Sequence, residues 1–147
     1  MKVVAENKRA RFEYEILETF EAGIVLTGDE IKSVRLGHFS IVDCYGFVKD
    51  DECFLRNSYI KEYSNSFDAG RFGDTSRRDR KLLLHKLEIA KIKRRIEVEK
   101  LTLVPTKAYF NGSNVKVEIA VAKGKKLYDK RETLKKRDIE RNLRTKL

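Results

Sequence analysis

Residues 115–122 read VKVEIAVA, and this stretch decides the fold. Its larger apolar residues alternate with smaller or charged ones, which is the period of a β-strand with one buried face. These apolar residues are Val115, Val117, Ile119 and Val121. The dipeptide Asn111-Gly112 predicts a tight turn just before this strand, so the strand-like stretch 101–110 is expected to pair with it as a hairpin. Pro105 predicts an edge or a bulge in that stretch.

The alternation stops at Lys123, and the sequence that follows is strongly basic. Residues 123–147 contain eleven Lys or Arg and four Asp or Glu, so they carry +7 of the chain's formal charge of +10. A basic arm of this kind typically binds polyanions. Its apolar residues are too few to hold it against a core, although its helix propensity is high. We expect a body of residues 1–122 and a tail of residues 123–147 that is disordered alone.

Composition indicates one soluble domain in a reducing compartment. The chain has 147 residues, of which 41% are hydrophobic, and no run approaches the roughly 18 apolar residues of a membrane span. The first residues show no signal-peptide pattern. Cys44 and Cys53 have no C-x-x-C spacing and are interpreted as small core residues. His38 and His85 are isolated, so no metal site and no cofactor are expected.

The N-terminal half predicts short strands and one helix. Residues 12–16 alternate apolar residues with glutamates and predict a first strand, and residues 23–26 predict a second. Thr27 and Glu30 fit a capping box that starts a helix of about two turns, ending near Leu36.

The middle of the chain predicts a hairpin, a loop and a helix. Residues 41–49 and 52–60 are apolar and are separated by two aspartates, which indicates a hairpin. Residues 62–79 are polar and are interpreted as a long surface loop. A helical region is expected to open at residues 80–86. Its apolar face is formed by Leu82, Ile89, Ile92 and Ile96.

Together these elements predict a mainly β fold with helices. About six antiparallel strands and two to three helices are typical of a small closed or nearly closed β-barrel, and an OB-like topology is the natural candidate. A basic C-terminal tail completes the chain.

No catalytic constellation stands out. The sequence has no glycine-rich phosphate loop and no nucleophile elbow. Asp29 and Glu30 are adjacent, so on a helix they point about 100 degrees apart and form no acid/base pair. We expect a protein that is not an enzyme. A ribonuclease is the alternative, and it would need a metal site that the sequence does not offer.

Basic clusters indicate a nucleic-acid partner. Four of them in a chain of pI 9.6 favour RNA or DNA, since each phosphate contact releases counterions, although each cluster alone is also compatible with a solvated surface. The first three clusters are Asn7, Lys8, Arg9 and Arg11; Arg77, Arg78, Arg80 and Lys81; and Lys91, Lys93, Arg94 and Arg95, and the tail is the fourth. Phe12, Tyr14 and Tyr128 could stack on bases, while core packing is the alternative for Phe12 and Tyr14.

Five stretches in order carry a resemblance to a known family. The chain resembles the small protein B family, the SsrA-binding proteins of bacteria, over nearly its whole length. The matching stretches are NKRARFEYEI, ETFEAGIVLTGDEIKSVR, RKLLLHKLEI, LTLVPTKAYF and VKVEIAVAKGKKLYDKR. Three departures from the family pattern are Tyr128 where some members have His, Lys100 where Gly is usual, and the lack of a proline in SRRDRK.

The resemblance implies a non-enzymatic adaptor in the cytoplasm. Members bind transfer-messenger RNA and bring it, charged with alanine, to ribosomes stalled on messages that lack a stop codon. Elongation factor Tu is part of the delivery complex. The resemblance also implies an OB-like barrel and a tail that becomes helical in the empty messenger channel of the small subunit.

Site residues follow from the resemblance together with the basic clusters. Glu30 corresponds to the family glutamate that contacts RNA, and an exposed carboxylate at this capping position could still accept from a base or a 2′-hydroxyl. The other residues expected to bind RNA are Asn7, Lys8, Arg9, Arg11, Lys32, Arg35, Arg80, Lys81, Lys123, Gly124, Lys125 and Lys126. The tail residues expected in the decoding centre and messenger channel are Tyr128, Asp129, Lys130, Arg131, Lys135, Lys136 and Arg137.

Two other interpretations stay open at this point. One is a structural component of the ribosome or a general single-strand binder on an OB scaffold. The other is the ribonuclease considered above.

Overall fold

The computed structural model describes residues 2–63 and 73–124, which contain nine strands and three helices. In chain order they are β1 (Lys2–Glu6), α1 (Lys8–Glu13), β2 (Tyr14–Ile24), α2 (Gly28–Arg35), β3 (Phe39–Ser40), β4 (Tyr45–Lys49), β5 (Glu52–Arg56), β6 (Tyr59–Ile60), β7 (Arg80–Leu83), α3 (Lys86–Glu99), β8 (Thr102–Asn111) and β9 (Asn114–Gly124). No helix in these two ranges is long and apolar enough to cross a membrane.

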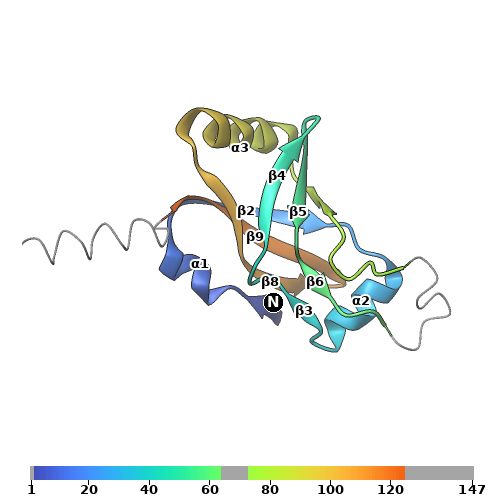
Figure 1. Cartoon of the computed structure of the whole chain (residues 1–147). Helices are drawn as coiled ribbons and strands as arrows, with labels where there is room; N and C mark the ends of the chain where they lie inside the picture. Colours follow the sequence, from blue (N-terminus) through green and yellow to red (C-terminus); the bar gives the residue numbers. More distant parts are fainter. Residues whose placement is uncertain (1, 64–72, 125–147) are drawn as a thin grey trace, which may run out of the picture.

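Six strands close into a ring, as Figure 1 shows. Their order is β8-β4-β5-β7-β2-β9, and β9 pairs back with β8. Strand β1 extends the sheet by pairing with the far end of β8, while β3 and β6 form a separate two-stranded sheet. All of these pairings are antiparallel. The predicted mainly β architecture with helices is confirmed.

The predicted C-terminal hairpin is confirmed. Strands β8 and β9 are paired up to Asn111 and Asn114, and Gly112 has a φ of 64°, which glycine adopts without a Cβ penalty. The register shifts between Pro105 and Lys107, where a bulge was predicted. Strand β9 also pairs with β2 along its length and continues to Gly124, two residues beyond the predicted end of the body.

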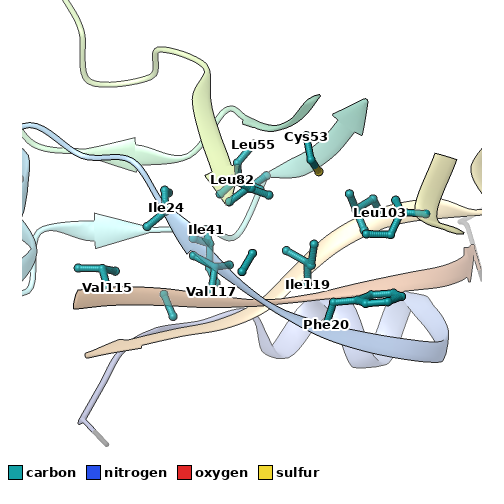
Figure 2. Packing of buried hydrophobic residues seen from close by; sticks show 14 of the residues in the cluster. Phe20, Ile24, Ile41, Cys53, Leu55, Leu82, Leu103, Val115, Val117 and Ile119 are labelled. Atoms are coloured by element: carbon teal, nitrogen blue, oxygen red, sulfur yellow. The ribbon is translucent and has the colours of Figure 1, made fainter. Parts of the chain in front are cut away.

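The inward face of β9 forms one wall of the core. Its four larger apolar residues are buried, as the alternation predicted. Figure 2 shows Val117 and Ile119 facing Leu82 and Leu55 across the ring, while Leu103 comes from the neighbouring strand β8. Cys44 and Cys53 are buried in the same cluster. Burial raises the pKa of the Cys53 thiol to about 11 and raises that of Cys44 as well, so both are protonated at neutral pH. Their interpretation as core residues is confirmed.

Helix α1 takes the first two residues of the strand predicted at residues 12–16. The Asn7 side chain accepts from the backbone N–H of Ala10 at 3.2 Å and starts the helix, which continues through residues 12 and 13 in spite of their alternation. Phe12 is consequently 68% exposed and is not a core residue. Ala10 packs outside the ring against Ala120 and Ala122, where small side chains let the helix approach the sheet. The strand begins at Tyr14 instead and runs as β2 through the predicted break at residues 18–22.

The helix predicted to open at Arg80 begins later. Residues 80–83 form strand β7, in which Leu82 faces the core. The backbone N–H of His85 donates to the Glu88 carboxylate at 3.1 Å, and α3 starts at the next residue. A run of leucines is compatible with a strand or a helix. The cap at His85 is the local feature that marks where the helix begins. Ile92 is buried and Ile89 and Ile96 pack beside it, which confirms three of the four residues of the predicted apolar face; the fourth, Leu82, lies on β7.

Two further local predictions hold, whereas the loop predicted at residues 62–79 lies partly outside the described residues. The capping box of Thr27 and Glu30 starts α2, and the helix ends one residue before the predicted limit. Strands β4 and β5 form the predicted hairpin, with Asp50 and Asp51 at φ values of 51° and 59° in its turn. Both strands are shorter than expected: residues 41–44 form a turn before β4, and Tyr59 and Ile60 form the separate strand β6.

Candidate nucleic-acid interface

The buried side chain of Arg80 connects its own strand β7 to α2, to the segment before β6 and to the segment before β7. Its side chain is fully buried, and its guanidinium donates to Glu30 Oε2 at 2.8 Å and to both the carbonyl and hydroxyl oxygens of Ser58 at 2.8 and 2.7 Å. It also donates to the carbonyls of Thr75 and Ser76. This geometry makes Arg80 a structural anchor, and the prediction that it contacts RNA is corrected, because its side chain does not reach the surface.

Glu30 is the counterion of two arginines. Its carboxylate accepts from Arg80, from Arg78 and from the backbone N–H of Thr27 at 2.9 Å. Burial favours the neutral acid, but these hydrogen bonds and the charge of Arg80 outweigh it and lower the pKa of Glu30 below its ordinary value. The expected exposed carboxylate is therefore wrong: Glu30 is buried, and its oxygens are already taken by this network.

Asn7 is the third predicted RNA-binding residue that lies inside. Besides capping α1, it donates to the carbonyl oxygens of Ile41 at 3.3 Å and Pro105 at 3.1 Å. These bonds fix α1 against the ring. The prediction of an RNA contact by Asn7 is corrected for the same reason as for Arg80.

The neighbours of Asn7 form a basic surface on α1. Lys8, Arg9 and Arg11 are exposed; Arg9 pairs with Glu13 at 3.1 Å, whereas Lys8 and Arg11 make no ion pair with any residue that the structure describes. Gly124 pairs with Tyr14, the residue that ends α1, so the end of β9 lies beside this helix (Figure 1). We call the exposed cations Lys8, Arg9, Arg11 and Lys123 the α1 surface.

A second basic surface lies on α2. Lys32 and Arg35 are exposed, and the Lys32 ammonium lies 5.4 Å from the centre of the Tyr63 ring. Arg35 lines a hollow of about 550 Å³ together with Lys2, Phe110 and Gly112. Lys2, Lys32 and Arg35 constitute the α2 surface, which joins α2 to the β8–β9 turn.

The other predicted clusters are largely neutralised. On α3, Lys91 and Arg95 both pair with Glu18, at 2.7 and 3.2 Å, and Lys93 pairs with Asp51 at 3.3 Å. Lys81 is exposed but pairs with Glu52 at 3.2 Å. These cations act first as surface ion pairs, so the α1 and α2 surfaces are the stronger candidates for phosphate.

Sequence reasoning missed one polar contact between distant strands. The Tyr109 hydroxyl donates to the Glu21 carboxylate across 88 positions of sequence. Burial and this hydrogen bond to a carboxylate raise the pKa of Tyr109 to about 12. No local pattern signals such a pair, because it depends on the ladder that sets β8, β9 and β2 side by side.

Comparison with known proteins decides the family. The model of the SmpB protein family matches residues 4–147. The chain belongs to the SmpB family. No group of His, Cys, Asp and Glu that could hold a metal ion occurs in residues 2–63 and 73–124.

Relatives of this SmpB-family chain span it almost entirely. It is 52% identical over 142 residues to an SsrA-binding protein of Sphingomonas elodea, covering 96% of this chain and 87% of the relative. It is 53% identical to one of Mesorhizobium japonicum, covering 93% and 85%. A solved structure described as "tmRNA-SmpB: a journey to the center of the bacterial ribosome" matches with a TM-score of 0.66 and 46% identity, covering 82% of this chain and 83% of that one.

The structure explains how Lys100 replaces the glycine that is usual in the family. Lys100, where the family usually has Gly, ends α3 in the left-handed region at φ 58°, so the backbone turn is kept without the glycine.

The predicted residues of the tail are not part of this geometry. Residues 125–147 lie outside the described ranges, so the roles assigned from Lys125 to Arg137 stay predictions.

Proposed function

We propose that this chain is a non-enzymatic adaptor that binds transfer-messenger RNA and delivers it to stalled ribosomes. The observation that carries the proposal is the match, at 46% identity over most of both chains, to the SmpB of a transfer-messenger RNA and ribosome structure. Family membership over residues 4–147 supports it across the whole length. The family assignment also favours an adaptor over the ribonuclease.

The α1 and α2 surfaces are the proposed RNA contacts of the body. Apart from Arg9, the cations of these surfaces make no ion pair with a described residue and can approach phosphates directly. Arg9 must first leave Glu13 and Asp43. Lys81 can join them once it leaves Glu52. Glu30 would act indirectly, because it holds Arg78, whose side chain is about one third exposed, at the edge of the buried network.

The finer parts of the function follow the division between body and tail. The body would bind the RNA, while residues 127–147 would form a helix in the messenger channel and place Tyr128, Asp129, Lys130 and Arg131 in the decoding centre. Delivery together with elongation factor Tu, and a cytoplasmic location, belong to the same proposal.

A binding comparison tests the proposal. The full chain should bind transfer-messenger RNA much more tightly than bulk transfer RNA at equal salt, because a structured partner offers contacts beyond phosphate. Equal affinity for both RNAs, or for any single strand, would instead favour the general single-strand binder.

A further inference from the structure

The outer face of the β4–β5 hairpin carries aromatic rings where a solvent-facing strand usually carries polar residues. Along β5, Cys53 and Leu55 face the core, so Phe54 and Arg56 face outward. The ladder places Phe47 opposite Phe54, and Tyr45 opposite Arg56. The two phenylalanine rings stack, with centroids 5.4 Å apart and planes 22° apart. Neither the core nor the basic clusters account for this row.

Arg56 continues the row as a flat cation. Its guanidinium carbon lies 4.2 Å from the centre of the Phe47 ring. Its edge is held by two parallel hydrogen bonds to Asp79, at 3.1 and 3.0 Å. Packing on one side and a bidentate pair on the edge fix the plane of the group before any ligand arrives.

A second arginine is arranged in the same way close by. The Arg77 guanidinium lies 5.1 Å from the centre of the Tyr59 ring and donates to Asn57 Oδ1 at 3.1 Å. Asn57 in turn donates to the carbonyl of Asp43 at 3.0 Å. Between the two guanidiniums lies a hollow of about 420 Å³, lined by Tyr45, Arg56, Asn57, Arg77 and Asp79.

This hollow has the chemistry of a nucleobase site. Proteins read unpaired RNA by stacking bases on aromatic rings or arginine planes. Here two such planes border the hollow, and two cations against one carboxylate leave a positive balance for the adjoining phosphate. The Arg56–Asp79 pair alone would be enough for a purely structural role. Such a role does not account for Tyr45, which is 42% exposed and lines the hollow.

We infer that the Arg56–Arg77 hollow binds an unstacked base of single-stranded RNA. The hollow is lined by none of the cations of the α1 and α2 surfaces. The inference rests on the proposed function in so far as RNA is the partner. The base can come from transfer-messenger RNA or from ribosomal RNA, which share this chemistry.

The test separates stacking from charge. The probe is a short oligoadenylate carrying a fluorescent adenine analogue, titrated with the full chain, and inorganic polyphosphate serves as the base-free anion. Arg56→Lys and Arg77→Lys keep the charge and remove the plane. Each should weaken oligoadenylate binding by about tenfold and reduce the change in fluorescence on stacking, with polyphosphate affinity unchanged.

Arg94→Lys is the matched control. Arg94 is an exposed arginine of α3 that makes no ion pair with the described residues, so its substitution should alter neither titration. The unfolding temperature of each variant checks that the fold is kept, and Arg77→Lys, which leaves the Arg56–Asp79 pair intact, tests the hollow if Arg56→Lys is unstable. Oligoadenylate affinity equal to that of the unchanged chain in both variants would overturn the inference, as would a parallel loss of polyphosphate binding.

Two further titrations, with transfer-messenger RNA and with small ribosomal subunits, identify the RNA that supplies the base. They also distinguish a failure of this inference from a failure of the proposed function. Weaker binding of Arg56→Lys to transfer-messenger RNA, or to small ribosomal subunits, would support the inference and name the RNA. If the unchanged chain binds oligoadenylate through Arg56 but does not prefer transfer-messenger RNA, the proposed function fails and the hollow stands. If it prefers transfer-messenger RNA and Arg56→Lys changes nothing in any titration, only the hollow fails.

Discussion

Glu30 is the residue on which the buried charges of this fold depend. Arg80 is buried without access to water, and Glu30 is the carboxylate that balances it. The local sequence pattern predicts that Glu30 caps α2 and gives no sign of its ion pair. In the structure one oxygen serves the cap of α2 and the other accepts from Arg80. A capping pattern is local and therefore readable, whereas an ion pair across 50 positions is not.

Replacing Glu30 by alanine should destabilise the fold strongly. Glu30→Ala leaves the Arg80 guanidinium buried without a counterion, which costs about 3–5 kcal/mol. Urea unfolding at neutral pH measures the loss. The control is Glu52→Ala, which breaks the exposed pair with Lys81 at a cost of about 0–1 kcal/mol. Equal losses in the two variants would show that Arg80 does not rely on Glu30.

The same residue gives the fold a defined response to acid. The folded-state pKa of Glu30 lies below the ordinary value of 4.5, so the ionised carboxylate stabilises the fold at all pH values above 4.5. That contribution is lost as the pH falls from there through the folded-state pKa. Unfolding measured across this range should therefore show the stability difference between the original chain and Glu30→Gln shrinking in acid. A difference that stays constant below this pH would assign the stabilisation to shape rather than charge.

At the scale of elements, the sequence prediction was correct where a helix cap could be recognised and wrong where it could not. The cap of α2 is a strong side-chain pattern and was predicted; the start of α1 at Asn7 was hidden because residues 12–16 also alternate. The LLLH run before α3 offered the same ambiguity. In both cases a single capping contact, and not the apolar period, decides between strand and helix.

The end of α3 offers a stabilising substitution. Lys100 adopts φ 58°, and a side chain in the left-handed region costs about 1–2 kcal/mol relative to glycine's freedom there. Lys100→Gly should thus raise the free energy of unfolding by about 1 kcal/mol. Thermal or urea unfolding measures the change.

The neighbouring helical residue is its control. Glu99→Gly places the same glycine at a position with ordinary helical geometry, and it should lower stability by about 0.5–1 kcal/mol. Were both substitutions destabilising, the left-handed end of α3 would not be strained by its lysine.

For the whole molecule, the ring could be predicted as a class but not as an order of strands. Alternation in residues 115–122 predicts a half-buried strand, yet the pairings β8 with β4 and β5 with β7 depend on side chains that meet only in three dimensions. The site shows the same limit. Residues 8–11 and Lys123 were each readable as basic, and only the pairing of Tyr14 with Gly124 brings them together.

The proposed division of labour predicts a truncation phenotype. Removing residues 127–147 should leave binding to transfer-messenger RNA nearly unchanged, because the α1 and α2 surfaces and Lys123 remain. It should abolish peptide transfer to that RNA on stalled ribosomes, measured in a reconstituted translation reaction. Leu134→Pro, which removes no charge but breaks a helix, should behave like the truncation.

Two outcomes would contradict it. Full transfer by the truncated chain would remove the tail from the mechanism. A loss of RNA affinity parallel to the loss of transfer would make the tail part of the RNA site.

The placement of β9 has a mechanical consequence. Any pull on the chain beyond Gly124 enters the fold along β9, which is bonded to β2 on one edge and β8 on the other over most of its eleven residues. Because antiparallel ladder bonds lie perpendicular to the strand, an axial force loads both ladders in shear, all bonds together, rather than opening them one after another. Drawing β9 out of the ring along its axis therefore requires both ladders to yield together.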